Sequence, residues 1–292
     1  MREREETFNT ADGRHLFERA WLPAGRPGAA VVIVHGYAEH SGRYGHVAER
    51  LVGSGHAVYA FDLRGHGRSD GPRALVRALD EHVADLRSFL ARVQQRAPQV
   101  PLFVLGHSMG GTIVALFLLS DQQAVHGAIL SGAGLKLRGG PARILQALLS
   151  VLGRLAPNLP LGQLKSEEIS RDAAVVSSYD GDPLVYRGRM PAGTASALIR
   201  AVRGIRDSMA SITVPLLLLH GGADRLTEPD GSRDLYQRAG SRDRTLKVYE
   251  GLYHEVFNEP EKERVLDDLV GWLNQRTEAP AKEDPTDADT SS

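Results

Sequence analysis

The stretch that most constrains this chain is residues 100–112, VPLFVLGHSMGGT. The apolar run at 102–105 indicates a strand buried on both faces, and residues 112–120 contain no Gly or Pro, as expected of a helix. Between them lies Gly106-His-Ser-Met-Gly110, a serine with a glycine two residues away on either side. A serine on a strained strand-to-helix turn needs such neighbours, because side chains there would clash. The motif predicts a nucleophile elbow with Ser108 at its apex.

A pattern of five residues with two glycines also occurs by chance. The alternative is a glycine-rich turn in which Ser108 only caps the following helix. A reactive serine would need more from the chain: a base, an acid that orients the base, and N–H groups for an oxyanion.

Length and composition limit the possibilities. At 292 residues the chain suits one large α/β domain, with or without an insertion, or two small domains. The hydrophobic content of 42% and charged content of 24% are ordinary for a globular protein, and a net charge of −1 gives no electrostatic reason to expect nucleic acid as a partner. The absence of cysteine excludes disulfides, a thiol nucleophile and Cys-ligated metal.

The sequence shows no sign of a targeting or membrane-spanning segment. The opening MREREETF lacks the apolar stretch of a signal peptide, and no apolar run approaches the roughly 20 residues needed to cross a bilayer. We expect a cytoplasmic protein, with peripheral membrane association left open.

Strand and helix patterns alternate along most of the chain. Strands are predicted at 3–9, 14–22, 29–34, 57–61, 102–105, 125–130, 214–219 and 245–249, and helices at 43–54, 78–96, 112–120, 228–239 and 256–274. After an opening hairpin, this order predicts a mostly parallel sheet with helices on both faces. Ligands of such sheets bind at the carboxyl ends of the strands, where His35-Gly36, residues 62–69 and Ser108 all lie.

The alternation is interrupted between about residues 134 and 189, where helical pieces are split by prolines. We expect core segments at 1–133 and 191–276, a helical insertion at 134–190, and a disordered acidic tail at 277–292.

Asp224 and His254 are the candidate acid and base. Asp224 follows a strand and Gly221-Gly222, and His254 lies in the loop after the last strand, so the chain order is Ser, Asp, His. The alternative readings are a turn aspartate and a solvated loop histidine. Glu228 and Asp230 compete with Asp224 but lie past the strand end.

The oxyanion donors are expected to be two backbone N–H groups, one from Met109 after the serine and one from Tyr37 in the loop after the third strand. No metal or cofactor is needed for this chemistry. A metal site at His35, Glu39, His40 and His46 is a weak alternative, because the chain has no His-Glu-x-x-His helix.

These elements resemble the α/β-hydrolase superfamily, and within it the monoacylglycerol lipase family. The resemblance rests on HGYAEHSGRY at 35–44, DLRGHGRS at 62–69, GHSMGG at 106–111, YDGDPL at 179–184 and the placement of Asp224 and His254. It covers about residues 8–275 and implies a mostly parallel eight-stranded sheet with a helical cap. It also implies a serine hydrolase that cleaves monoacylglycerols to fatty acid and glycerol through an acyl-enzyme.

The resemblance further implies that Glu39, Arg43 and Tyr179 lie near a polar pocket for the glycerol end. Their plainer readings are a surface acid, a salt bridge at a helix start and a cap aromatic. A broader carboxylesterase or lysophospholipase with the same three residues stays open, as does a non-catalytic binding module. Dehalogenases and epoxide hydrolases use an aspartate nucleophile, which Ser108 argues against.

Residues 134–165 carry five cations and no acid, and their apolar residues recur at helical spacing. The cations are Lys136, Arg138, Arg143, Arg154 and Lys165, and the apolar residues are Ile144, Leu148, Val151, Leu152 and Leu155. This pattern fits either a helix packed on the cap's own core or a face that contacts a membrane and admits lipid. Oligomeric state and acyl preference are not predicted.

Overall fold

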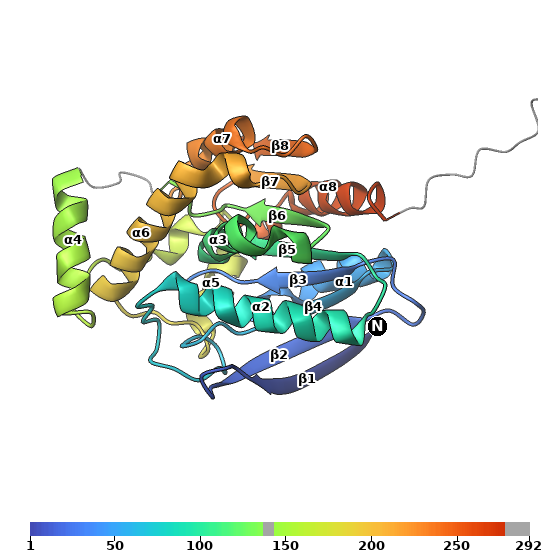
Figure 1. The fold of residues 1–292 in the computed structure, drawn as a ribbon, viewed down its shortest axis with the longest axis horizontal. Helices are drawn as coiled ribbons and strands as arrows, with labels where there is room; N and C mark the ends of the chain where they lie inside the picture. The colour runs from blue at the N-terminus through green and yellow to red at the C-terminus, as the bar shows by residue number, and fades with distance from the viewer. Residues whose placement is uncertain (137–142, 278–292) are drawn as a thin grey trace, which may run out of the picture.

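One eight-stranded sheet organises the protein, in the order β1-β2-β4-β3-β5-β6-β7-β8 (Figure 1). The computed structural model describes residues 1–136 and 143–277. The strands are β1 (Arg2–Asn9), β2 (His15–Leu22), β3 (Ala30–Val34), β4 (Ala57–Phe61), β5 (Leu102–His107), β6 (Gly127–Ser131), β7 (Leu216–Gly221) and β8 (Arg244–Tyr249). β1 and β2 pair antiparallel, β2 joins β4 antiparallel, and every later pairing is parallel. The predicted mostly parallel sheet of eight strands is confirmed.

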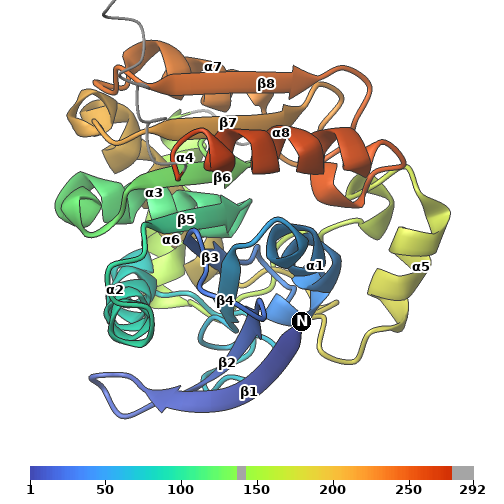
Figure 2. The same ribbon diagram turned by 90° about the vertical axis from the view of Figure 1, so that its right-hand side faces the viewer.

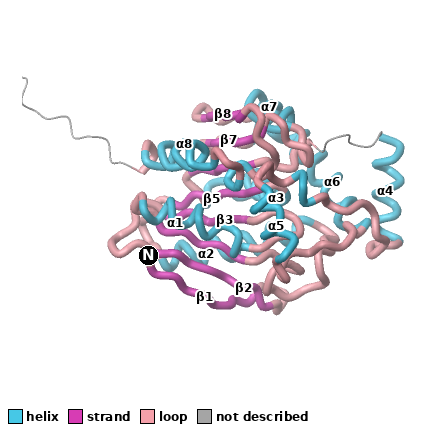
Figure 3. Tube along the Cα trace, turned by 180° about the vertical axis from the view of Figure 1, so that it is seen from behind, coloured by secondary structure: helices cyan, strands magenta, loops and turns pink. Residues whose placement is uncertain are grey.

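Helices cover both faces of the sheet, as predicted. The helices are α1 (Gly45–Gly53), α2 (Leu79–Arg96), α3 (Met109–Asp121), α4 (Arg143–Leu155), α5 (Ala173–Gly181), α6 (Ala192–Ser208), α7 (Pro229–Arg238) and α8 (Lys262–Asn274). α1 and α8 lie on one face, which Figure 3 shows from the front, and their buried side chains join one apolar core. The larger core on the other face is built from α2, α3, α6 and α7.

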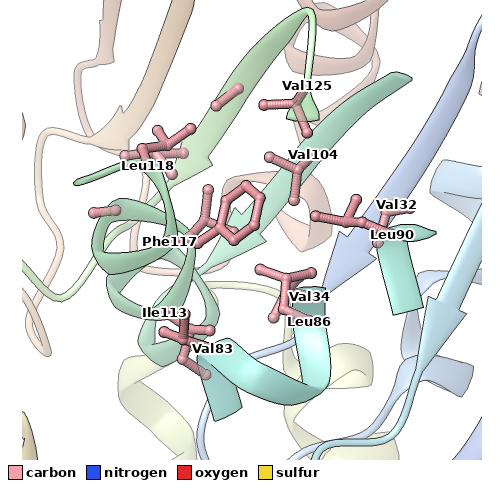
Figure 4. Packing of buried hydrophobic residues seen from close by; sticks show 14 of the residues in the cluster. Val32, Val34, Val83, Leu86, Leu90, Val104, Ile113, Phe117, Leu118 and Val125 are labelled. Carbon is pink, nitrogen blue, oxygen red and sulfur yellow. The ribbon is translucent and has the colours of Figure 1, made fainter. Parts of the chain in front are cut away.

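The central strands are hydrophobic along their whole length because both of their faces are buried. α2 and α3 pack on this layer, where Leu86, Ile113 and Phe117 belong to the same buried cluster as Val34 and Val104 (Figure 4). α3 is apolar almost all round, as expected of a helix enclosed by protein. The strand before Ser108 is thus buried along its length, and the helix after it is buried over its first turns.

Two sequence-based boundaries are wrong. The helix expected at 256–274 is a short 3₁₀ turn at Val256–Asn258 followed by α8, because Pro260 cannot continue the hydrogen bonding of a helix from the first turn. The helix expected at 43–54 likewise divides into a 3₁₀ turn at Ser41–Tyr44 and α1. α6 was not predicted from the sequence at all.

Between β6 and α6 the chain forms α4, a 3₁₀ turn at Ser166–Glu168, and α5. α4 lies beside α6 on the side toward which β3 and β6 point (Figure 1), and α5 lies on the side toward which β7 and β8 point (Figure 2). α4 and α5 therefore stand over the carboxyl ends of the strands, and the separate status of residues 134–190 as a cap stays a prediction. The expected disordered tail falls almost entirely outside the described residues. No described helix combines the length and the apolar character that crossing a bilayer requires.

Candidate active site

Ser108 occupies the sharp turn between β5 and α3, with φ 53° and ψ −116°. This conformation is unfavourable for any residue with a side chain. A Cβ on Gly106 would lie 2.5 Å from the Gly110 carbonyl oxygen, and a Cβ on Gly110 would lie 2.1 Å from the Val34 carbonyl oxygen. Both glycines are therefore required sterically, as the motif predicted. The Ser108 side chain makes no capping hydrogen bond to α3, which argues against the alternative reading.

Asp224 and His254 form a buried pair, with His254 Nδ1 2.7 Å from Asp224 Oδ2. The other carboxylate oxygen, Oδ1, accepts hydrogen bonds from the backbone N–H groups of Leu226 and Thr227 at 2.8 and 3.0 Å. Burial raises the pKa of Asp224, but the neighbouring histidines outweigh burial and hold that pKa below its ordinary value. The carboxylate is thus fixed in position and ionised, with one oxygen directed at the His254 ring.

His254 is buried, which lowers its pKa, yet the charge and hydrogen bond of Asp224 more than offset burial and raise the pKa above the ordinary 6.5. The hydrogen bond at Nδ1 leaves Nε2 as the ring nitrogen available to a reacting group. The Asp224 contact thus orients the ring and stabilises its protonated form, which are the two properties a general base needs.

Ser108 and His254 are brought to the same place by β6 and β5. The Ser108 N–H donates to the Ser131 carbonyl at 3.0 Å, and a Cβ on the next residue, Gly132, would lie 3.3 Å from the His254 ring. His107, which precedes the serine, packs its ring 4.8 Å from that of His254. The three predicted residues therefore share one neighbourhood at the carboxyl edge of the sheet.

Two residues around the acid were not singled out from the sequence. Thr227 Oγ1 donates to Asp224 Oδ2 at 2.8 Å, and His220 Nε2 lies 3.2 Å from the same oxygen. Ser232 holds the other ring nitrogen of His220 at 2.8 Å. His220 therefore bridges the Asp224 carboxylate and the Ser232 hydroxyl. In the sequence, the only local sign of these contacts is the position of Thr227, three residues after Asp224, and threonine at that distance is common.

The loop after β3 presents the Tyr37 N–H. His35 Nε2 accepts from the Leu63 N–H at 2.8 Å, so the ring proton is on Nδ1 and is donated to the Gly36 carbonyl, also at 2.8 Å. Burial lowers the pKa of His35 to about 4, which keeps the ring neutral. In the trans peptide of Gly36 and Tyr37 the N–H points opposite to the carbonyl. His35 therefore fixes the direction of the Tyr37 N–H.

The Tyr37 and Met109 N–H groups donate no hydrogen bond to any of the residues described here. The Met109 N–H is the first of α3, where the helix has no partner to offer and its dipole favours negative charge. A Cβ on Gly36 would lie 3.2 Å from Ser108 Cβ, so the loop of Tyr37 runs directly past the serine. The arrangement can accept an oxyanion formed at Ser108.

Comparison with known proteins agrees with this geometry. A family model described as serine aminopeptidase, S33, matches residues 25–261. A monoacylglycerol lipase of Mycolicibacterium smegmatis is 45% identical over 269 residues, 92% of this chain and 96% of that protein. The chain belongs to the monoacylglycerol lipase family of α/β-hydrolases.

Other family members are similar over comparable lengths. The human monoglyceride lipase is 38% identical, with 91% of this chain and 89% of that protein covered. The crystal structure of Paleococcus ferrophilus monoacylglycerol lipase superposes with a TM-score of 0.78 at 33% identity, covering 94% of this chain and all of that one.

The three residues that the family resemblance placed near a polar pocket lie together. Arg43 Nη1 donates to Glu39 at 2.8 Å, and the Arg43 guanidinium lies 4.8 Å from the centre of the Tyr179 ring. Glu39 also accepts from the Gly36 N–H at 2.6 Å and from the Tyr44 hydroxyl at 2.8 Å. The plain reading of Glu39 as a surface acid is wrong, because its side chain is buried and accepts a hydrogen bond from the Gly36 N–H, next to Tyr37.

Glu255, directly after His254, completes this cluster and was not predicted from the sequence. Arg43 binds it through both terminal nitrogens, at 2.6 and 2.7 Å, and Asn258 donates to it at 2.8 Å. Burial raises the pKa of Glu255, but Arg43 overcomes burial and holds that pKa at about 2. Since two carboxylates share one guanidinium, the cluster ties the loop of Tyr37 to the loop of His254.

The weak metal reading finds no support in geometry. His35 and Glu39 are engaged by backbone N–H groups, and His46 contacts the Phe257 carbonyl at 2.8 Å. In residues 1–136 and 143–277, no three His, Asp or Glu side chains are grouped so as to hold a metal ion.

Proposed function

We propose that this protein is a serine ester hydrolase that cleaves monoacylglycerols into fatty acid and glycerol through an acyl-enzyme. The observation that carries the proposal is the strained Ser108 beside the buried Asp224–His254 pair, with two backbone N–H groups that find no partner among the described residues. The names of its relatives in the family support the substrate class.

In the first half of the reaction, Ser108 Oγ attacks the ester carbonyl carbon while His254 Nε2 takes the hydroxyl proton. Asp224 holds the ring and stabilises the imidazolium. The carbonyl oxygen becomes an oxyanion that accepts from the Tyr37 and Met109 N–H groups, each worth about 3 kcal/mol in the transition state. The tetrahedral intermediate collapses as His254 gives its proton to the departing glycerol oxygen.

In the second half, a water molecule enters where glycerol was. His254 removes a proton from it as its oxygen attacks the acyl carbon, and the same two N–H groups bind the second oxyanion. Collapse returns the proton to Ser108 and releases the fatty acid. Both halves use the same groups, so the site needs only one geometry.

The glycerol end is assigned to the side of the site walled by Glu39, Arg43 and Tyr179. Glu39 and Arg43 are already engaged with each other and with the chain, so they shape the wall. The Tyr179 hydroxyl donates no hydrogen bond within the described part of the protein, although its ring is buried. Of the three, Tyr179 is therefore the residue able to bind a glycerol hydroxyl directly.

Substrate profiling tests the proposal. Purified protein is assayed on monoacylglycerols of several chain lengths, on lysophospholipids and on p-nitrophenyl esters. We expect the highest kcat/KM on a monoacylglycerol. A higher kcat/KM on lysophospholipids would make lysophospholipids the substrate class. If the protein neither hydrolysed any ester nor reacted with a fluorophosphonate probe, it would be a non-catalytic binding module.

We also propose that α4 contacts a membrane when the enzyme takes up lipid. Leu148, Val151 and Leu155 are 60%, 56% and 80% exposed on this helix, a large apolar area for a protein surface. Leu152 is only partly exposed, so α4 has one side toward α6 and another toward solvent.

One of the five cations of this segment is paired with an acid. Lys136 is paired with Asp230 at 3.1 Å, and Arg138 and the Arg143 side chain lie outside the described residues. The apolar side chains therefore carry the proposal.

Replacing both Leu148 and Val151 by Asp is expected to lower binding to phosphatidylcholine vesicles by about a hundredfold or more, since each exposed apolar side chain contributes roughly 1.5 kcal/mol on burial. Vesicle sedimentation measures it. Ser177 and Ser178 are exposed on α5, and changing them to Asp adds the same charge elsewhere as a control. Equal binding by a folded Leu148/Val151 variant and by that control would exclude the membrane role.

A further inference from the structure

The chain that follows α5 contacts the loop of residues 35–40, the oxyanion loop that carries the Tyr37 N–H, at three points. Asp182 Oδ2 lies 2.8 Å from His40 Nε2, and the Tyr186 N–H donates to the Ala38 carbonyl at 2.8 Å. The Tyr186 ring also meets the Tyr37 ring edge to face, 6.4 Å between centres. These contacts join segments about 140 residues apart, and none involves Ser108, Asp224 or His254.

The bond between Asp182 and His40 is directional. His40 Nδ1 accepts from the Gly42 N–H at 3.1 Å, so the ring proton is on Nε2 and points at the carboxylate. The second oxygen of Asp182 accepts from the Leu184 N–H at 2.8 Å, in a turn that Pro183 helps to fix. Burial raises the pKa of Asp182, but these two donors outweigh burial and lower that pKa below its ordinary value. The result is a charge-assisted hydrogen bond between an ionised carboxylate and a nearly buried ring.

The oxyanion loop needs this outside support. Ala38 has φ 70°, a left-handed conformation that costs a residue with a side chain about 1 kcal/mol or more. Tyr37, whose N–H is the proposed donor, immediately precedes it. His35 orients the peptide that carries the Tyr37 N–H, but a relaxation at Ala38 would shift Tyr37 as a whole and so change the distance of that N–H from Ser108.

We propose that Asp182 is a positioning residue for the oxyanion hole, which holds the Tyr37 loop in its reactive shape through His40 and the adjoining bond from Tyr186 to Ala38. The proposal rests on the proposed function in one respect, that the Tyr37 N–H binds the oxyanion. It gives the YDGDPL motif a role apart from substrate binding by Tyr179. It also makes the residues after α5 a structural part of the catalytic machinery.

The test replaces Asp182 by Ala and compares it with Asp180→Ala, an exposed carboxylate two residues earlier on α5. We expect kcat on a soluble short-chain ester to fall about tenfold to a hundredfold, as for a displacement of about 1 Å at a catalytic group. KM should change less than about twofold, and the affinity for a boronic acid that forms a tetrahedral adduct should weaken by the same factor as kcat. Asp180→Ala should leave all three unchanged.

A second variant guards against loss of folding. His40→Ala should lower kcat at least as far, because it removes the bond to Asp182 and also the acceptor of the Gly42 N–H, and the double variant should add nothing to the His40 variant. If Asp182→Ala does not fold, Asp182→Asn, which keeps the volume, is judged by the same measurements.

Several outcomes would overturn the positioning role. They are unchanged kcat and boronate affinity in a folded Asp182 variant, a change in KM alone, or a double variant whose losses multiply. In each of these cases the proposed function would still hold if the wild-type enzyme is active and the Ser108→Ala variant is inactive. A wild-type protein that hydrolyses no ester would overturn both.

Discussion

Replacing Ser108 by Ala is expected to lower kcat on a monoacylglycerol by about 10⁵-fold or more, because the nucleophile and the base act as a unit and neither substitutes for the other. Reaction with a fluorophosphonate probe should disappear as well. The thermal midpoint should stay within a few degrees, since the Ser108 side chain makes no capping bond and Ala suffers the same backbone strain at φ 53°. Product release measured by titration of the fatty acid gives the rate.

Ser120 offers a matched control. It lies near the end of α3 and bonds to the Phe117 carbonyl and Asp121, away from the site. Ser120→Ala should keep full activity. If the Ser108 variant were to retain more than about a hundredth of wild-type turnover, a level far above what the rest of such a site supplies alone, the elbow would not carry the nucleophile.

Replacing Asp224 by Asn should lower kcat by about 10⁴-fold while leaving KM nearly unchanged. The physical reason is specific to the contacts here. The backbone N–H groups of Leu226 and Thr227 require an oxygen at the position of Oδ1, so the new amide nitrogen must face His254. An N–H there forces Nδ1 of the ring to accept. The proton then moves to Nε2, the nitrogen that has to take one from Ser108.

This prediction is checked by steady-state kinetics and by the chemical shifts of the His254 ring nitrogens. Asp230→Asn is the control, because Asp230 is exposed and pairs only with surface cations among the described residues. Near-normal kcat in the Asp224 variant would mean that another carboxylate orients the ring, and Glu255 next in the chain would be the first to examine.

The sequence predicted the sheet and the Ser108 turn well, because both leave local signs. Buried parallel strands are continuous apolar runs, and the turn requires glycine at fixed distances from the serine. Asp224 and His254 were found by chain order within that frame. The roles of all these residues stay predictions, while their proximity is a property of the structure.

Other features left no local sign. Asp182 meets His40 across 142 positions and Arg43 meets Glu255 across 212, so neither pair forms a pattern within a sequence window. A surface acid stayed open as the plainer reading of Glu39, because its partners are a backbone N–H and side chains that only the folded loop assembles. Tertiary contacts decided these environments, and neither periodicity nor helix and strand propensity reports them.

The guanidinium of Arg43 links two loops of the candidate active site, the loop of Tyr37 and the loop of His254. Its positive charge pairs with Glu39, in the loop after Tyr37, and with Glu255, which follows His254. The spacing between the loop of Tyr37 and the loop of His254 is therefore constrained by this ion cluster in addition to the strands that carry the two loops. Because these ion pairs of Arg43 are nearly buried, dissolved salt screens them far less than it screens charges on the surface.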